Sequence, residues 1–323
     1  MEALLSTYSA ETRLAEIIPA YVSSAYQWIA VRQRFDQFHR NLQLTLTQRM
    51  DGYIKVGGVL RCLNQHYCGS SPGDANGFVI GSWGKDTATR PPRDVDIYFV
   101  LPPDVYFRFE RCIGNRQSAL LQEVRGVLLP TYPDTRMRAD GQVVLVEFGS
   151  YAVEVVPAFL LADGRYWICD TSGVGRYKLT DPNAEVSYIE QVDLPSNRNL
   201  RPLIRMLKTW QAFCSVPIKS FQLELVAAEF LAQSPWRQHN YFWFDWITRD
   251  FFIYLYLKAS TSIAIPGTGE WNFLGNEWES RSWTAWNRAT RACELDRTNY
   301  VEDAGEEWQK IFGNDLPRRP RWS

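Results

Sequence analysis

The segment that most constrains the fold is a short apolar stretch, residues 94–101, that begins with two carboxylates, Asp94 and Asp96. Its residue types favour a β-strand, which we expect to run from Asp96 to Leu101 and to end at Pro102. Side chains along a strand alternate between its two faces, so Asp94 and Asp96 point to the same face. Two like charges held side by side repel each other, and a cation is needed to offset them.

Such a pair of carboxylates is typical of a magnesium site, because Mg²⁺ prefers oxygen ligands and shares the phosphate oxygens of a substrate. Two metal ions about 3.5–4 Å apart stabilise both the attacking and the leaving oxygen of a phosphoryl transfer. A third carboxylate is then expected on a neighbouring strand. Glu154 fits this role, because it interrupts the apolar residues 153–156, where a charge is costly unless it is paired or metal-bound.

A Gly-Ser turn precedes the two aspartates, with Ser82 twelve residues before Asp94. Its backbone N–H groups and its hydroxyl can contact a triphosphate, and Gly81 lets the backbone come close. A D-x-D pattern alone is common and usually lies on a solvated surface. The turn, the apolar strand and Glu154 together favour a metal site.

The chain changes character near residue 195. Before that point, hydrophobic spacing predicts helices at residues 20–50 and 115–129, and strands at residues 78–80, 96–101, 142–148 and 151–156. The last two strands form a hairpin, and Pro157 is expected to end it. After that point, helical spacing recurs at residues 200–213, 221–231, 280–295 and 304–312. We expect an α+β part, residues 1–195 with a long N-terminal helix, and a helical part, residues 196–323.

Composition narrows the classes of function. With 46% hydrophobic and 22% charged residues among 323, the chain is expected to fold into one or two domains. A net charge of −1 provides no long-range attraction for nucleic acid. No apolar run approaches the roughly 20 residues that span a bilayer, and the first residues do not resemble a signal peptide. The six cysteines are scattered, without a C-x-x-C pair. We therefore expect a cytoplasmic protein with reduced thiols and no membrane partner.

The pattern of these residues resembles that of the polymerase-β-like nucleotidyltransferases, in Gly81-Ser82, Thr87, Asp94-x-Asp96 and Glu154. More narrowly, it is similar to the CD-NTases, the bacterial relatives of cyclic GMP-AMP synthase and of oligoadenylate synthase. The Gly-Ser turn with three carboxylates is specific to the superfamily.

Three later segments add to this resemblance. Residues 203–210 resemble the family's helix with a phosphate-contacting lysine, here Lys208. Residues 219–224 resemble the segment whose serine, here Ser220, contacts the triphosphate and whose next residue, here Phe221, stacks on the base. Residues 308–317 resemble the closing motif near the family's C-terminus. The matches span residues 78–317, which is most of the chain.

The resemblance implies a two-lobed fold: a polymerase-β-like core with a mixed sheet, a C-terminal helical bundle and an active site in the cleft. It implies that Asp94 and Asp96 hold two Mg²⁺ or Mn²⁺ ions. Glu154 then holds the catalytic ion and helps to activate an acceptor ribose hydroxyl, while pyrophosphate leaves. The resemblance further implies that Gly81, Ser82 and Thr87 bind nucleotide. It also implies that nucleoside triphosphates, most of all ATP and GTP, are converted to a cyclic di- or trinucleotide messenger of anti-phage (CBASS) signalling, with CBASS proteins as possible partners.

The sequence departs from the family pattern at two positions. The third carboxylate is Glu154 where aspartate is commoner, and Asp86 stands where many relatives have glycine. Two other functions use the same pattern: a nucleotidyltransferase that modifies RNA ends or a protein, and an inactive nucleotide sensor. An RNA-modifying enzyme is expected to have a basic face, which the charge balance disfavours. Clustered carboxylates without a metal only strain a fold, which disfavours the sensor.

Overall fold

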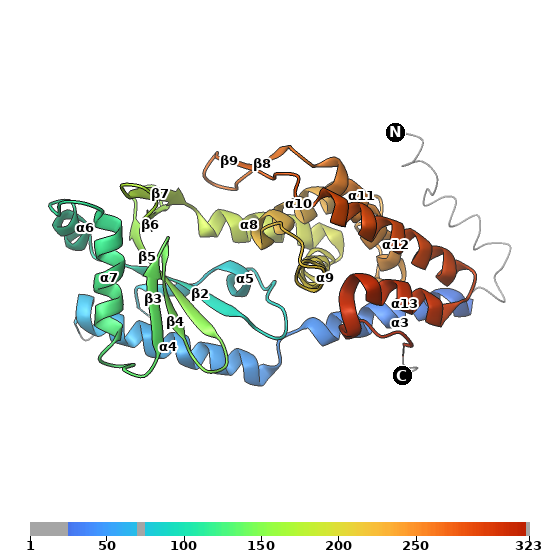
Figure 1. Cartoon of the computed structure of the whole chain (residues 1–323), viewed down its shortest axis with the longest axis horizontal. Helices are drawn as coiled ribbons and strands as arrows, with labels where there is room; N and C mark the ends of the chain where they lie inside the picture. The colour runs from blue at the N-terminus through green and yellow to red at the C-terminus, as the bar shows by residue number, and fades with distance from the viewer. Residues whose placement is uncertain (1–24, 70–74, 321–323) are drawn as a thin grey trace. The chain divides into compact units, whose positions relative to one another are not determined.

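A computed structural model describes residues 25–69 and 75–320 of the chain (Figure 1). These residues form two units that are each discontinuous in sequence. The sheet unit contains the described residues of 44–188 together with residues 266–269. The helical unit contains residues 25–43, 189–265 and 270–320. The domain boundary at residue 195 stays a prediction, and in this grouping the first described helix belongs to the helical unit.

The sheet unit is built on a seven-stranded mixed sheet with the strand order β1-β2-β5-β4-β3, in which β6 also pairs with β5 and β7 with β6. Among the described strands of this sheet, β2 and β5 are parallel neighbours and the other pairs are antiparallel. The strands are β1 (Gly77–Val79), β2 (Asp94–Val100), β3 (Arg136–Asp140), β4 (Val143–Glu147), β5 (Ala152–Leu160), β6 (Tyr166–Asp170) and β7 (Arg176–Thr180). The predicted β1, β2 and β4–β5 hairpin are confirmed, with ends that differ by a few residues.

The predicted end of β5 is wrong, because the strand continues through Pro157 to Leu160. On one side, seven residues of β5, Ala152 to Ala158, pair with the whole length of β2. On the other side, β4 pairs up to Val155 and β6 begins at Ala158. Pro157 therefore lies in the gap between two neighbours. A proline has no N–H group to donate, so this gap is where a strand accommodates it.

Five described helices belong to the chain segment that forms the sheet unit. They are α4 (Leu46–Cys68), α5 (Gly81–Gly84), α6 (Pro103–Phe109), α7 (Arg116–Leu128) and α8 (Pro182–Asp193), of which α8 continues into the helical unit. The described part of the helix predicted at residues 20–50 forms two consecutive helices, α3 (Ala25–Leu42) and α4, with a break at residues 43–45. Residues 20–24 lie outside the described residues. Thr45 begins α4 with a capping box, in which its side chain accepts from the backbone of Gln48.

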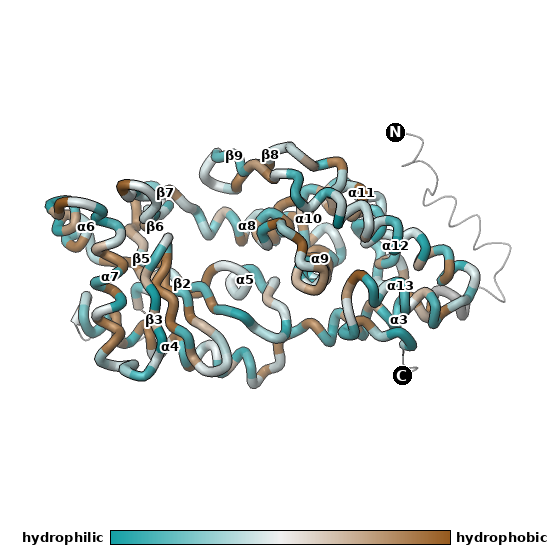
Figure 2. The backbone as a smooth tube through the Cα atoms, in the orientation of Figure 1, coloured by the Kyte–Doolittle hydropathy of each residue, from teal (hydrophilic) through white to brown (hydrophobic). Residues whose placement is uncertain are grey.

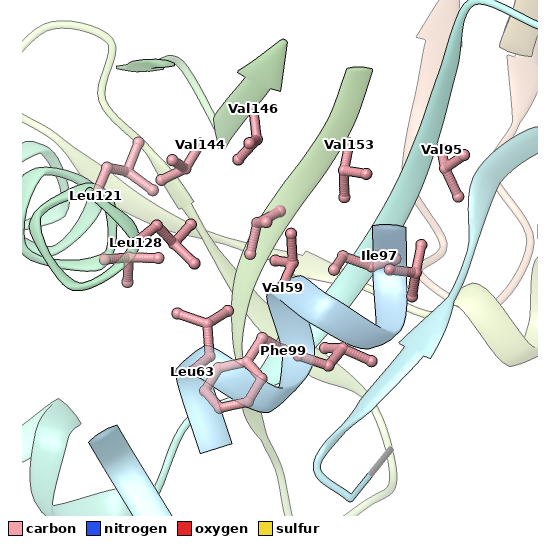
Figure 3. Packing of buried hydrophobic residues seen from close by; sticks show 14 of the residues in the cluster. Val59, Leu63, Val95, Ile97, Phe99, Leu121, Leu128, Val144, Val146 and Val153 are labelled. Atoms are coloured by element: carbon pink, nitrogen blue, oxygen red, sulfur yellow. The ribbon is translucent and has the colours of Figure 1, made fainter. Parts of the chain in front are cut away.

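The core of the sheet unit lies between one face of the sheet and the helices α4 and α7. Figure 3 shows Val59 and Leu63 of α4 and Leu121 and Leu128 of α7 among the buried residues. The sheet contributes alternate residues of each strand, Val95, Ile97 and Phe99 from β2 and Val144, Val146 and Val153 from β4 and β5. The brown parts of the tube in Figure 2 mark these apolar strands. The residues between them, including Asp94, Asp96 and Glu154, consequently point to the opposite face.

The helical unit contains α3, α9 (Leu200–Phe213), α10 (Ser220–Gln233), α11 (Phe244–Leu257), α12 (Glu279–Arg297) and α13 (Val301–Phe312), together with a hairpin of β8 (Ser262–Ala264) and β9 (Trp271–Phe273). Short 3-10 turns lie at Leu194–Ser196, Tyr241–Trp243 and Gly313–Asp315. The four predicted helices after residue 200 are confirmed as α9, α10, α12 and α13. Within the described ranges, no helix combines the length and the apolar character that crossing a membrane requires.

A fully buried ion pair joins α3 to α12 inside the helical unit. The Nη1 atom of Arg34 donates to both carboxylate oxygens of Asp296 at 2.8 Å, and neither side chain is exposed. The indole N–H of Trp308 donates to the same carboxylate at 3.3 Å. A buried charge that loses its partner is strongly destabilising, so this pair fixes how α3 packs.

We predict that Arg34→Met lowers the free energy of unfolding by about 3–5 kcal/mol, because it leaves Asp296 as an unpaired buried charge. Arg40→Ala is the matched control, because it removes an exposed pair with Asp36 at 2.9 Å and is expected to cost less than about 1 kcal/mol. The double variant Arg34→Met, Asp296→Leu should recover most of the loss. Urea unfolding followed by tryptophan fluorescence measures all three, and equal losses in Arg34→Met and Arg40→Ala would contradict the account.

Candidate active site

The three predicted carboxylates lie on adjacent parallel strands and on one face of the sheet. Asp96 of β2 is directly opposite Glu154 of β5, and Asp94 is opposite Ala152, one pair earlier. All three side chains are partly exposed, while Val95, Val153 and Val155 beside them are buried. The alternation of the two strands thus brings together three acidic residues that are separated by up to sixty positions in the sequence.

Burial and mutual repulsion perturb these carboxylates. Burial, followed by the charges of Asp94 and Glu154, raises the pKa of Asp96 well above its usual range. Burial and the charge of Asp94 likewise raise the pKa of Glu154. The two carboxyl groups of Asp96 and Glu154 also hydrogen-bond to each other. A site of this kind favours any cation that relieves the repulsion.

The Gly-Ser turn lies against Asp96. Gly81 has a positive φ of 59°, and a Cβ atom at this position would lie 2.0 Å from Oδ2 of Asp96. The backbone N–H of Ile80 donates to the carbonyl oxygen of Asp96 at 2.9 Å. Glycine is therefore required here both for its backbone conformation and for the close approach. Ser82 follows in α5 and is partly exposed.

Thr87 and Trp83 hold this turn in place. The backbone N–H of Thr87 donates to the carbonyl oxygen of Ser82 at 2.7 Å, and the Thr87 side chain is fully buried. Trp83 packs on α4 at Gly52, where an added Cβ would lie 2.4 Å from the indole ring. The predicted nucleotide contact of Thr87 stays a prediction. In the structure this residue holds the shape of the turn that carries Ser82.

Lys85 is a residue of this site that the sequence analysis did not single out. Its side chain is almost completely buried and forms an ion pair with Glu185 of α8 at 3.2 Å. The pKa of Asp96 is raised by burial and by its two acidic neighbours, and the positive charge of Lys85 offsets part of that rise. The position of Lys85 between Gly84 and Thr87, within the Gly-Ser segment, could have indicated from the sequence that it belongs to the site. Nothing in the sequence indicated that Glu185 is its partner.

Asp86, one of the two departures from the family pattern, has a left-handed backbone with φ of 52°. That conformation is the one in which glycine is most easily accommodated, and aspartate is among the few other residues that adopt it. Its carboxylate accepts from Arg49 of α4 at 2.8 Å. The ion pair partly neutralises the additional negative charge that Asp86 brings to the turn.

The other three predicted nucleotide contacts lie in the helical unit. Lys208 of α9 forms an ion pair with Glu224 of α10 at 2.5 Å, and both side chains are almost completely buried. The hydroxyl of Ser220, at the start of α10, donates to the side-chain oxygen of Gln211 at 2.8 Å. Phe221 is partly exposed. Their contacts with phosphate and base stay predictions.

The donor set fits divalent metal ions by its chemistry. Burial and the charge of Asp94 raise the pKa values of both Asp96 and Glu154, and carboxylate oxygens are the ligands that Mg²⁺ and Mn²⁺ prefer. Over residues 25–69 and 75–320, no cluster of three or more His, Cys, Asp or Glu side chains is already arranged as a metal site. Substrate phosphate oxygens commonly complete the coordination of Mg²⁺ in sites of this kind.

Comparison with known proteins decides the family. Residues 29–193, slightly more than half of the chain, match the Second Messenger Oligonucleotide or Dinucleotide Synthetase domain. The chain belongs to this synthetase family. A probable cyclic nucleotide synthase of Bacillus cereus (strain VD146) is 22% identical over 274 residues, which cover 74% of this chain and 81% of the relative. A cyclic AMP-AMP-AMP synthase of Acinetobacter sp. is 21% identical over 250 residues, which cover 75% and 72%.

The fold of the synthetase is that of the polymerase-β-like CD-NTases. The structure of E. coli MS115-1 CdnC with ATP superposes with a TM-score of 0.67 at 18% identity and covers 88% of this chain and 98% of CdnC. The predicted resemblance and fold class are thereby confirmed. The synthetase is a nucleotidyltransferase that makes cyclic oligonucleotides.

We predict that Gly81→Ala lowers the rate of synthesis by at least about 100-fold, because displacing Asp96 or the turn by an ångström disrupts the reacting geometry. Gly141→Ala is the matched control. Gly141 has a similar φ of 63°, but a Cβ there meets nothing within 4 Å. Both variants carry the same backbone strain of about 1 kcal/mol. Synthesis rates that fall equally in both variants would show that strain, and not the contact with Asp96, limits activity.

Lys208 permits a test that separates a phosphate contact from packing. Lys208→Met should lower stability by about 3–5 kcal/mol, because Glu224 remains buried without its cation. It should also raise the KM for nucleoside triphosphate about tenfold or more. The double variant Lys208→Met, Glu224→Met removes the buried charge and should recover stability while the KM stays high. A KM that returns to the wild-type value in the double variant would show that Lys208 acts only in packing.

Proposed function

We propose that the protein joins nucleoside triphosphates at Asp94, Asp96 and Glu154, with two divalent cations held by these carboxylates. The observation that carries the proposal is the pairing of Asp96 opposite Glu154 on the two parallel strands, with Asp94 on the same face. Gly81 of the Gly-Ser turn lies against Asp96, so the turn is beside these carboxylates. Mg²⁺ or Mn²⁺ bound there would neutralise the carboxylates and the charge that develops on the transferred phosphate.

Each residue has a role in this proposal. The acceptor ribose hydroxyl forms a bond to the α-phosphorus of a second nucleotide, the bond to pyrophosphate breaks, and Glu154 accepts the proton of the hydroxyl. Gly81 and Ser82 bind the triphosphate through backbone N–H groups and a hydroxyl. Lys208 and Ser220 also contact the triphosphate, and Phe221 stacks on the base.

We infer that ATP is a substrate, because the Acinetobacter relative is a cyclic AMP-AMP-AMP synthase and the CdnC structure holds ATP. GTP is the second candidate, and the product is a cyclic di- or trinucleotide. We further propose that this product is a messenger of anti-phage (CBASS) signalling in the cytoplasm, where nucleoside triphosphates are available. The membership of a second-messenger synthetase family supports this role.

The double variant Asp94→Asn, Asp96→Asn should abolish synthesis and keep the fold, because removing like charges relieves repulsion. Purified protein is incubated with labelled ATP, GTP, CTP and UTP and with Mg²⁺ or Mn²⁺, and the products are treated with phosphatase and resolved. A phosphatase-resistant product is expected for the wild type and not for the double variant, and omitting one nucleotide at a time identifies the bases. Thermal unfolding in the presence of a chelator checks the fold.

The matched control is Asp134→Asn, Asp163→Asn, which neutralises two exposed aspartates of the same unit. It should leave synthesis unchanged. A phosphatase-resistant product that persists in the Asp94→Asn, Asp96→Asn protein would refute the assignment of the site.

A further inference from the structure

A pocket of about 460 Å³ lies in the sheet unit, away from the three carboxylates. The ends of β2 and β5 contribute Val100 and Phe159, and Leu101 follows directly after β2. Residues of α6 and β6, together with Cys68 and Asn76, form the other sides. Val100 is four residues after Asp96, a distance of about 13 Å along a strand. Because β2 and β5 are parallel, both strands start at the carboxylates and end at this pocket.

Aromatic rings pack against one another in the walls of this pocket. The ring of Tyr106 lies 5.4 Å from that of Phe159 and 5.8 Å from that of Trp167. Phe107 and Leu160, which also line the pocket, are 61% and 57% exposed. Exposed large apolar side chains that cluster in a concave pocket are typical of a binding site.

The chemistry of the lining restricts the ligand. None of the described residues that line the pocket has a charged side chain. Polar side-chain groups come only from Asn76, Cys68, Tyr106 and Trp167 within that described lining. A triphosphate, or any ion without a counter-charge, would lose its hydration there without compensation. The volume lies within the range of about 300–1,000 Å³ that is usual for small-molecule sites.

We propose that this pocket binds a neutral small molecule that contains an aromatic ring, at a site separate from that of the nucleotide. The three rings of Tyr106, Phe159 and Trp167 offer the edge and face contacts that aromatic ligands use. The carboxamide of Asn76, which donates to Asn64 at 2.9 Å, supplies a polar group at the side of the pocket. A ligand held here contacts the same two strands that carry Asp96 and Glu154.

The test is a fluorescence titration of the full-length protein with Nile red, a neutral aromatic dye. We expect saturable binding to one site in the wild type. Leu160→Arg, which puts a charge at the open side of the pocket, should weaken binding at least tenfold, and Leu160→Met should not. Phe107→Glu should give the same loss as Leu160→Arg. Circular dichroism shows which variants keep the fold. Folding is expected for both charged variants, because Phe107 and Leu160 are more than half exposed.

Ile113→Arg is the matched control, because Ile113 is fully exposed in the same unit and is not among the residues that line the pocket. It should bind the dye as the wild type does. Saturating ATP with Mg²⁺ should also leave dye binding unchanged. Binding that survives both charged pocket variants, that is lost equally in Ile113→Arg, or that ATP displaces would overturn the proposal. None of these outcomes depends on whether the carboxylates are the catalytic residues.

Discussion

Parallel pairing of β2 with β5 places Asp96 directly opposite Glu154 and sets Asp94 one pair away on the same face. A slip of one residue in this register would turn the carboxylates of one strand toward the helices α4 and α7. The apolar core on that side, which includes Val95, Ile97 and Val153, prevents the slip, because it would bury charge and expose hydrocarbon. The core therefore holds three mutually repelling groups together.

The turn that faces these carboxylates depends on the same packing. Trp83 is anchored on α4 where Gly52 leaves room for its ring, and Gly81 brings the backbone against Asp96. Lys85 extends from the turn to Glu185 and offsets part of the negative charge. A helix, a turn and two strands thus position the three carboxylates and the Gly-Ser turn through contacts within the sheet unit.

Much of the fold and the grouping of the carboxylates could be predicted from the sequence, because they depend on local patterns of residue types. Alternation in residues 94–101 placed the aspartates on one face, and helical spacing located α7, α9, α10, α12 and α13. The rest depended on tertiary contacts. Pro157 was expected to end β5, but the gap between β4 and β6 accommodates it. Likewise, the ion pairs of Lys85 with Glu185 and of Lys208 with Glu224 join elements whose proximity no local pattern encodes.

The central claim is that Asp94, Asp96 and Glu154 together bind the metal ions of the reaction. The most direct measurement is anomalous X-ray diffraction from crystals grown with Mn²⁺ and a non-hydrolysable ATP analogue. The account predicts Mn²⁺ peaks bonded to carboxylate oxygens of Asp94 and Asp96, one of them shared with Glu154, and triphosphate oxygens on the same ions. Mn²⁺ and analogue bound elsewhere, with these three carboxylates unligated, would contradict it.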